Sequence, residues 1–176
     1  MSGHSHWAGI KHRKGLNDAK RGKVFTKHGK LITIAARGGG NPDTNFQLRL
    51  AIDRARLDNM PKENIERAIK RGTGELKGDE LSEIVYEAFG PGGIMMIIKT
   101  LTDNRNRTVS EIKTILGKFD AKFGGPGSVM WNFDSEDSEL KPKNIFKVDE
   151  KTREQYKKLL EALDDQDDVQ EIYDNL

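Results

Sequence analysis

The chain has 176 residues, of which 33% are charged and 35% hydrophobic, and it contains no cysteine. The absence of cysteine excludes disulfides, thiol catalysis and thiolate zinc sites. No apolar run approaches the roughly 20 residues that a membrane-spanning helix needs. The opening residues carry no apolar stretch, so we expect no secretory signal and a cytoplasmic location.

The net charge of +2 conceals a strong asymmetry between the two halves of the chain. Residues 1–77 hold 17 Lys/Arg and 7 Asp/Glu, a net charge of +10, whereas residues 78–176 hold 13 and 21, a net charge of −8. A basic half of this density is typical of proteins that bind a polyanion, and nucleic acid is the commonest one in cytosol. The alternative is a solvated, charge-rich surface that only keeps the protein in solution.

The first part of the chain reads as a basic arm followed by a helix. Residues 1–15 lack hydrophobic periodicity, and we expect a flexible basic arm there. A helical pattern begins near Asn17, with an apolar stripe on Val24, Leu31 and Ala35 that is widened by Phe25 and Ile32. The segment Arg37–Pro42, rich in glycine, ends this helix because glycine and proline continue a helix only at a cost.

Two further helices complete a basic three-helix bundle over residues 16–76. The second runs from about Thr44 to Asp58, where apolar residues recur at helical spacing. Asn59 is predicted to cap the third helix, with Pro61 tolerated in its first turn and Gly72 at its end.

Residues 77–176 change to a mixture of strands and helices. Ile84–Phe89 and Ile94–Ile98 are predicted strands, and the Gly-Pro-Gly-Gly segment between them predicts a hairpin. Asp103 or Asn104 is the expected cap of a helix in which Val109, Ile112 and Leu116 align.

The remaining elements follow a second glycine-rich segment. We predict a strand at Ser128–Phe133, a polar linker over residues 134–144, a helix around Tyr156–Leu163 and a last strand at Val169–Tyr173. The fold class is therefore α+β: a basic three-helix bundle followed by a small α+β sandwich domain with a ferredoxin-like alternation of strands and helices.

Long ordered motifs run through nearly the whole chain. They are Gly3-His4-Ser5-x-Trp7-Ala8-x-Ile10-Lys11-His12-Arg13-Lys14, Asp18-Ala19-Lys20-Arg21-Gly22-Lys23, Asn59-Met60-Pro61-x-x-Asn64-Ile65, Tyr86-Glu87-x-x-Gly90-Pro91-Gly92-Gly93, Thr102-Asp103-Asn104-x-Asn106-Arg107-Thr108, Gly127-Ser128-Val129 and Leu163-Asp164-x-x-Asp167-Asp168-Val169-Gln170. In these motifs the chain resembles the YebC/PmpR family, which includes the mitochondrial translational activators of cytochrome oxidase subunit I.

The resemblance implies a role in the control of gene expression. Family members are described either as DNA-binding transcriptional regulators or as factors that act in translation on the ribosome, and both alternatives stay open for this chain. Members usually carry a third domain inserted into the α+β domain. Residues 134–144 are short and polar where that domain would stand, so we expect it to be absent.

The predicted nucleic-acid site is a set of cationic and aromatic residues near the N-terminus. Lysine and arginine neutralise phosphate, histidine can hydrogen-bond to phosphate or base, and Trp7 can stack on an unpaired base, unless it packs back onto the bundle as an anchor. The set is His4, Trp7, Lys11, His12, Arg13, Lys14, Lys20, Arg21, Lys23 and Lys27. Arg105 and Arg107, beside a helix N-terminus, are predicted to add a phosphate contact, with ordinary capping and exposed arginines as the alternative.

The sequence offers little support for catalysis or metal binding. It has no P-loop, no dinucleotide fingerprint and no Ser/His/Asp set, and all four histidines lie in the first 28 residues. His4 and His6 alone make a poor metal site, and the acidic run Asp164–Asp168 does not match a calcium loop, so we expect a solvated turn or a protein contact there. We expect a protein that is not an enzyme, with no cofactor, metal, small-molecule substrate or membrane.

The expected partner is therefore nucleic acid, either ribosomal RNA or duplex DNA, with the ribosome as a further expected partner. Flexible cationic arms with a stacking aromatic fit folded RNA well, whereas a transcriptional regulator reads duplex DNA. The alternative function is a protein-interaction module that acts through the acidic C-terminal half.

Overall fold

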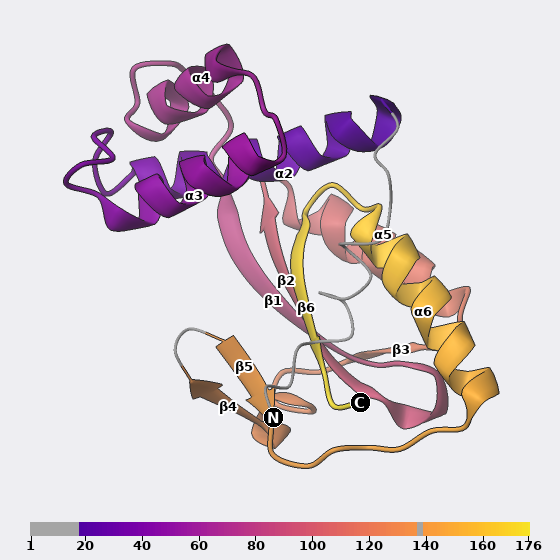
Figure 1. The fold of residues 1–176 in the computed structure, drawn as a ribbon. Coiled ribbons are helices and arrows are strands. Elements are labelled where there is room, and N and C mark those ends of the chain that lie inside the picture. Colours follow the sequence, from indigo (N-terminus) through magenta and orange to yellow (C-terminus); the bar gives the residue numbers. More distant parts are fainter. Residues whose placement is uncertain (1–17, 137–138) are drawn as a thin grey trace. The chain divides into compact units, whose positions relative to one another are not determined.

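The computed structural model describes residues 18–136 and 139–176, and its elements are labelled in Figure 1. The described chain divides into two compact units, a helical unit that ends at Ser82 and an α+β unit that begins at Glu83. The predicted α+β class is confirmed. The boundary predicted between residues 76 and 77 falls in the segment between the last helix of the first unit and the first strand of the second. The predicted arm, residues 1–15, lies outside the described residues.

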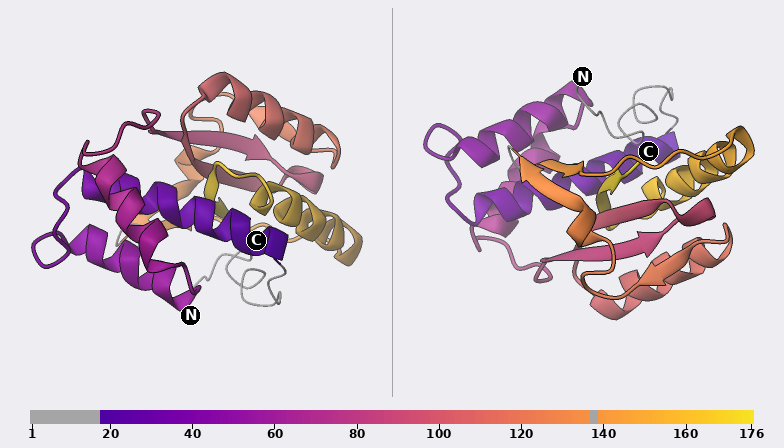
Figure 2. Two further views of the ribbon diagram at one scale, coloured as in Figure 1. Left: turned by 90° about the horizontal axis from the view of Figure 1, so that it is seen from above. Right: turned by 90° about the horizontal axis from the view of Figure 1, so that it is seen from below.

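The described part of the helical unit contains α2 (Asp18–Ala36), α3 (Phe46–Leu57) and α4 (Lys62–Gly72). Helices α3 and α4 both pack against α2, as Figure 2 shows from above. Asn45 caps the start of α3, because its side-chain oxygen accepts the backbone N–H of Leu48 at 3.1 Å. The buried core of the unit is formed by Ile32, Ala36, Leu48, Ile52, Ala55, Met60, Ile65 and Ala68.

The buried face of α2 agrees only in part with the predicted stripe. Its buried residues are His28, Ile32 and Ala36, and of the predicted stripe Ile32 is buried while Phe25 and Ala35 pack against the core as partly buried residues. Helix α4 approaches α2 closely at its last residue, Gly72. A Cβ atom at Gly72 would lie 2.3 Å from the carbonyl oxygen of Thr33 and 2.6 Å from the Cβ of Ala36. The absence of a side chain at Gly72 therefore allows the two backbones to meet.

Asn59 ends α3 instead of starting α4, so its predicted role as the cap of the third helix is wrong. It has a positive φ of 60°, which asparagine adopts more readily than most residues. The N–H of Asn59 donates to the carbonyl of Arg56 at 3.0 Å, and the N–H of Met60 donates to that of Ala55 at 2.9 Å. These are the two hydrogen bonds of a Schellman motif. Pro61 precedes the first residue of α4.

The α+β unit is built on a four-stranded sheet in the order β3-β1-β2-β6. The predicted hairpin is confirmed: β1 (Ser82–Phe89) and β2 (Met95–Thr102) are joined by a short 3-10 turn, η1 (Pro91–Gly93). Gly92 and Gly93 both have positive φ in this turn, which glycine adopts without strain. Strand β3 (Lys122–Gly124) pairs antiparallel with β1, and β6 (Val169–Asp174) pairs antiparallel with β2.

Two helices cover one face of this sheet. They are α5 (Arg105–Gly117), capped by Asn104, one of the two predicted candidates, and α6 (Glu150–Asp164), and Figures 1 and 2 show them on the same side of the strands. The core between helices and sheet includes Ile94, Met96, Ile98, Ile112, Leu116, Tyr156, Leu159, Leu160, Leu163 and Ile172. A smaller core of Ile97, Val129, Phe133 and Tyr173 lies on the opposite face.

The segment that follows β3 differs from the prediction in two ways. The predicted strand at Ser128–Phe133 is wrong, because residues Met130–Asn132 form a 3-10 turn, η2, and the strand β4 begins only at Phe133. The stretch predicted as a polar linker contains β4 (Phe133–Glu136) and β5 (Glu139–Pro142), which pair antiparallel. The N–H groups of Val129 and Met130 donate to the side chain of Glu87, so they are not available to a strand partner.

Candidate nucleic-acid interface

The helical unit carries the basic charge of the described chain. Residues 18–82 hold 14 Lys/Arg and 9 Asp/Glu, a net charge of +5, whereas residues 83–176 hold 13 and 19, a net charge of −6. Lysines 20, 23 and 27 of the predicted set lie on α2 and are half-buried. Their spacing of three and four residues places them on one face of the helix, away from the buried His28 and Ile32.

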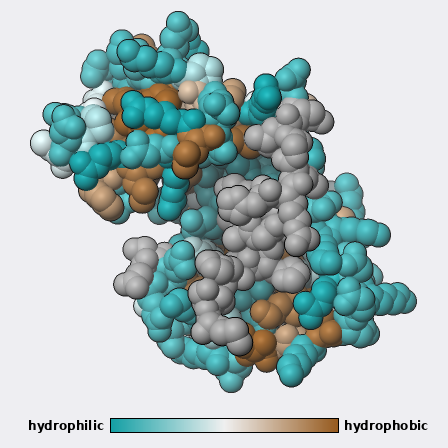
Figure 3. All heavy atoms as spheres, viewed as in Figure 1, coloured by the Kyte–Doolittle hydropathy of each residue, from teal (hydrophilic) through white to brown (hydrophobic). Residues whose placement is uncertain are grey.

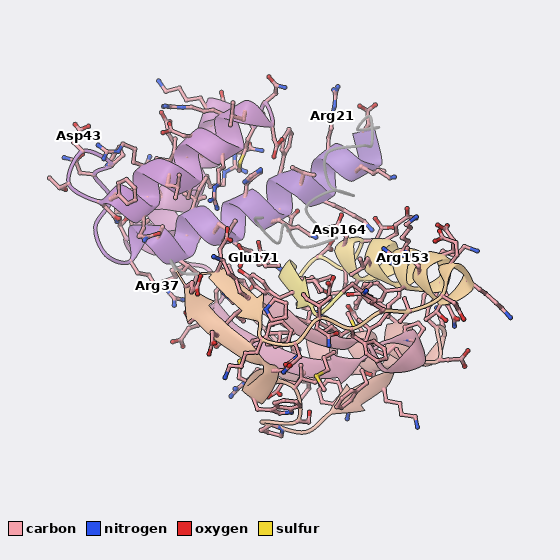
Figure 4. All side chains as sticks on the ribbon, turned by 60° about the horizontal axis from the view of Figure 1, so that its bottom comes forward. Arg21, Arg37, Asp43, Arg153, Asp164 and Glu171 are labelled. Carbon is pink, nitrogen blue, oxygen red and sulfur yellow. The ribbon has the colours of Figure 1, made fainter. Side chains whose placement is uncertain are left out.

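Arg21 is the most exposed of the predicted cations on α2. Its side chain is 60% exposed and lies 3.9 Å from the carboxylate of Asp18, one turn earlier. Figure 4 shows it pointing away from the helix near the start of α2, whereas Arg37 lies at the other end. Arg37 donates to the backbone carbonyl of Leu81 at 2.9 Å, so part of its hydrogen-bonding capacity is used within the unit.

Helices α3 and α4 add exposed cations that were not in the predicted set. Those on α3 are Arg49, Arg54 and Arg56, and those on α4 are Lys62, Arg67, Lys70 and Arg71. Guanidinium and ammonium groups that remain in solvent on three packed helices can approach a phosphate backbone without loss of the core. We call the exposed cations of these three helices the cationic platform, and its charge does not depend on any single lysine.

Six residues of the predicted site lie outside the described residues. They are His4, Trp7, Lys11, His12, Arg13 and Lys14. Their proposed contacts with phosphate and base remain predictions from the sequence.

Arg107 is held in a cluster at the start of α5, which we call the Asp168 cluster (Thr102, Asp103, Arg107, Thr108, Gln166 and Asp168). Its Nη2 donates to Asp103 at 2.7 Å and to Asp168 at 3.0 Å. These hydrogen bonds, first to Asp168 and then to Asp103, raise the pKa of Arg107 above its ordinary value. The contacts give Arg107 a structural role, and its side chain is still 42% exposed, so the predicted phosphate contact stays a prediction.

Asp168 is the buried centre of this cluster, with only 1% of its surface exposed. Its carboxylate also accepts the hydroxyl of Thr108 at 2.7 Å and the side-chain amide of Gln166 at 3.1 Å. A buried charge is tolerated when several donors compensate it in this way. The predicted solvated turn at Asp164–Asp168 is therefore wrong for Gln166 and Asp168, which are both buried.

Arg105 is the second predicted cation at this helix start, and it is exposed. It lies close enough to Tyr86 to affect that residue: burial raises the pKa of the Tyr86 hydroxyl, and the charge of Arg105 opposes the rise. Arg105 and Arg107 are both exposed at this helix start, and contact of either residue with an anionic ligand stays a prediction.

Glu87 is a second buried carboxylate that holds two segments of the α+β unit together, and we call this contact the Glu87 joint. Its carboxylate accepts backbone N–H groups from Gly127 at 2.6 Å, Val129 at 2.6 Å and Met130 at 2.7 Å. Burial by itself would raise the pKa of Glu87, but the three donors hold the pKa below its ordinary value. The loop after β3 is thereby fixed to the central strand β1.

His28 ties two helices of the basic unit together and was missed by the sequence prediction. It is 8% exposed, and its Nε2 lies 2.6 Å from the carboxylate of Asp58 at the end of α3. An aromatic residue at an apolar position of α2 was a sequence signal for burial, but the partner 30 positions away was not visible. His28 therefore stabilises the packing of α3 on α2 in the helical unit.

Residues 18–136 and 139–176 contain no group of three or more His, Asp or Glu side chains placed to hold a metal ion. None of the helices in the same ranges is both long enough and apolar enough to cross a membrane. The main polar features of the described side chains are thus the exposed charges and the two buried carboxylates, Asp168 and Glu87, with their hydrogen-bond donors.

This arrangement defines a two-part protein in which a basic helical domain precedes an acidic α+β domain. The family model described as "TACO1/YebC protein N-terminal domain" matches residues 5–75, and the one described as "TACO1/YebC second and third domain" matches residues 81–138 and 134–176. The chain belongs to the TACO1/YebC family.

Relatives and a solved structure agree with this assignment. A "Probable transcriptional regulatory protein" from Thermotoga maritima is 42% identical over 236 positions, which cover 99% of this chain and 93% of that protein. A protein of the same name from Petrotoga mobilis is 56% identical over 135 residues, or 76% of this chain and 54% of that protein. The crystal structure of a conserved hypothetical protein from Aquifex aeolicus matches with a TM-score of 0.86 at 35% identity, over 97% of this chain and 96% of that one.

The chain is shorter than such relatives. The match to the Petrotoga protein spans about half of that protein's length, at 54%. The alignment with the Thermotoga protein has 236 positions and this chain has 176 residues, so at least 60 positions have no residue here. The second family model matches in two pieces that meet at residues 134–138, within the segment where we predicted an inserted domain to be absent.

Proposed function

We propose that this chain is a cytoplasmic, nucleic-acid-binding regulator of gene expression of the YebC type, without enzymatic activity. The observation that carries the proposal is the basic helical unit, with its net charge of +5 over residues 18–82 and exposed cations on three helices. The predicted arm adds three Lys/Arg and no acid over residues 1–15. Charge of this density favours a phosphate backbone as the ligand.

We favour structured RNA on the ribosome as the target. Readers of duplex DNA insert a helix whose polar side chains contact base edges in the major groove. The outward face of α3 instead carries Phe46, Leu50 and Leu57, which have no hydrogen-bonding groups. Recognition of folded RNA relies more on shape, phosphate contacts and stacking, which is compatible with a cationic platform and with the predicted stacking of Trp7.

Regulation of transcription on duplex DNA is the second candidate, and one observation favours it. The relatives from Thermotoga maritima and Petrotoga mobilis are both named probable transcriptional regulatory proteins. The two candidates share the helical unit as the binding surface and differ in the nucleic acid.

The test is co-sedimentation with purified ribosomes near physiological salt, in the presence of excess random-sequence duplex DNA. Pelleting with ribosomes despite the competitor supports the translation proposal. Capture by the competitor supports DNA binding through charge. Loss of binding to both would contradict the proposed function.

A charge-matched pair of variants locates the surface. Replacing Lys20, Arg21, Lys23 and Lys27 with Gln is expected to lower the slope of log affinity against log salt by about 3, because each phosphate contact contributes roughly 0.7–0.9. The control removes the same charge from exposed lysines of the α+β unit: Lys118, Lys122, Lys147 and Lys158. An equal change of slope in both variants would show that net charge alone drives binding.

A further inference from the structure

Helix α3 is apolar on two opposite faces. Leu48, Ile52 and Ala55 are buried in the core of the helical unit. Phe46, Leu50 and Leu57 occupy positions i, i+4 and i+11, which coincide on the side of the helix that faces away from this core. Their exposed fractions are 63%, 37% and 82%. We call these three residues the outer face of α3.

Such a face is unusual for a helix on a protein surface. A surface helix normally places polar residues away from the core, and a helix that is apolar on both sides is normally buried on both sides. Figure 3 shows apolar surface over α3 on the helical unit. Clusters of exposed apolar side chains rimmed by polar ones are typical of interaction sites.

The outer face carries charges of both signs, including the exposed Asp53 between Leu50 and Leu57, but positive charge is in excess. Arg49 holds its guanidinium 5.5 Å from the centre of the Phe46 ring, and Arg54 and Arg56 lie further along the helix. The only acid within α3 is Asp53, which lies 3.6 Å from Arg56. The helix therefore has a net charge of +2, from three arginines and one aspartate.

This charge decides between the possible occupants. A second copy of the same face would bring two net positive surfaces together, which is unfavourable. Nucleic acid would satisfy the arginines, and an unpaired base can stack on Phe46, but nucleic acid gives the aliphatic Leu50 and Leu57 no apolar pocket. An acidic protein segment with apolar side chains at helical spacing satisfies both the rim and the centre.

We propose that the outer face of α3 is a docking surface for an acidic amphipathic helix of a partner protein. The apolar side of that helix covers Leu50 and Leu57, and its carboxylates pair with Arg49, Arg54 and Arg56 at the edge. The surface is separate from the predicted cations of α2, so the α2 cations stay available to nucleic acid while the α3 arginines pair with the protein partner.

The test is a titration of the full chain into a fluorescently labelled synthetic peptide, followed by anisotropy. The peptide is helical, with leucines at helical spacing and glutamates beside them, and the control peptide has the same composition in scrambled order. We expect the ordered peptide to bind and the scrambled one to bind at least tenfold more weakly. Each of Leu50→Gln and Leu57→Gln is expected to weaken binding of the ordered peptide about tenfold, because each removes a buried aliphatic contact.

Leu76→Gln is the matched control, since Leu76 is 41% exposed in the same unit but lies outside α3. We expect it to leave peptide binding unchanged. All three leucines are solvent-exposed, so the variants should keep the wild-type circular dichroism and melting temperature. Binding of a single-stranded RNA oligonucleotide is measured in parallel and is expected to be the same in all variants.

Three results would overturn the proposal. Equal affinity for the ordered and scrambled peptides would show attraction by charge alone. Undiminished peptide binding by the Leu50→Gln, Leu57→Gln double variant would place the peptide elsewhere. A loss of RNA binding in that double variant, without a loss of peptide binding, would make the outer face a nucleic-acid surface. The peptide measurement does not depend on whether the chain binds ribosomes, so it stands or fails separately from the proposed function.

Discussion

Replacing Glu87 with Gln is expected to destabilise the α+β unit by about 3 kcal/mol. One carboxylate oxygen accepts the N–H of Gly127, and the other accepts those of Val129 and Met130. Glutamine has a single carbonyl oxygen, so at best it keeps two neutral hydrogen bonds and turns its own N–H₂ group toward the third donor. A hydrogen bond to a charged group contributes roughly 1.5–3 kcal/mol, and one such bond is lost while two are weakened.

The loss should depend on pH, because the three donors hold the pKa of Glu87 below its ordinary value in the folded protein. A carboxyl group whose pKa is lower in the folded state contributes stability that is complete above the pKa of the unfolded chain, about 4.3. That contribution is lost as the pH falls through the folded value. The stability gap between wild type and Glu87→Gln should therefore be widest near pH 7 and narrow toward pH 3.

Urea unfolding followed by circular dichroism at several pH values measures this gap. The control is Glu83→Gln, an exposed acid on the same strand, which should change stability by less than about 0.5 kcal/mol. A loss below about 1 kcal/mol at pH 7, or a gap that stays constant down to pH 3, would refute the view that the charge of Glu87 fixes the loop.

Two further substitutions test the contacts of Asp168 with α5 and of Gly72 with α2. Asp168→Asn removes the charge that Arg107 and Thr108 face. It should lower the free energy of unfolding, measured with urea, by about 2 kcal/mol, a moderate loss because Arg107 is partly in solvent. An equal loss in the exposed control Asp167→Asn would contradict this. Gly72→Ala places a Cβ 2.3 Å from the carbonyl oxygen of Thr33 and should lower the free energy of unfolding by about 1–3 kcal/mol. Gly22→Ala is the control, since no atom lies within 4 Å of a Cβ at that position. An unchanged melting temperature for Gly72→Ala would argue against close packing of α4 on α2.

The parts of the fold that the sequence predicted well are those determined by local patterns. The helix of Leu48 and Ile52, the hairpin around Pro91 and the cap at Asn104 each depend on residues within one or two turns of each other. Such signals are complete within a short window of the chain. The predicted strand at Ser128–Phe133 failed because its backbone donors are taken by Glu87, some 40 positions earlier in the sequence.

The site was harder to predict for the same reason. Arg107 has the sequence context of a phosphate ligand at a helix start, and its hydrogen bond to Asp168, 61 positions away, could not be predicted from the local sequence. The outer face of α3 was missed because the helical pattern was used to find one buried stripe. The exposed Phe46 and Leu57 belong to a second apolar stripe, on the opposite side of the same helix.

Four of the motifs in which the chain resembles the family meet in pairs inside the α+β unit. The Tyr86-Glu87 motif meets the Gly127-Ser128-Val129 motif at the Glu87 joint, and the motif that contains Arg107 and Thr108 meets the one that contains Asp168. Each pair joins segments at least 40 positions apart through a buried carboxylate, so these motifs determine the shape of the α+β unit. These motif residues therefore stabilise the α+β unit, whereas the proposals on partners depend on the exposed cations and the outer face of the helical unit, where the variants above act.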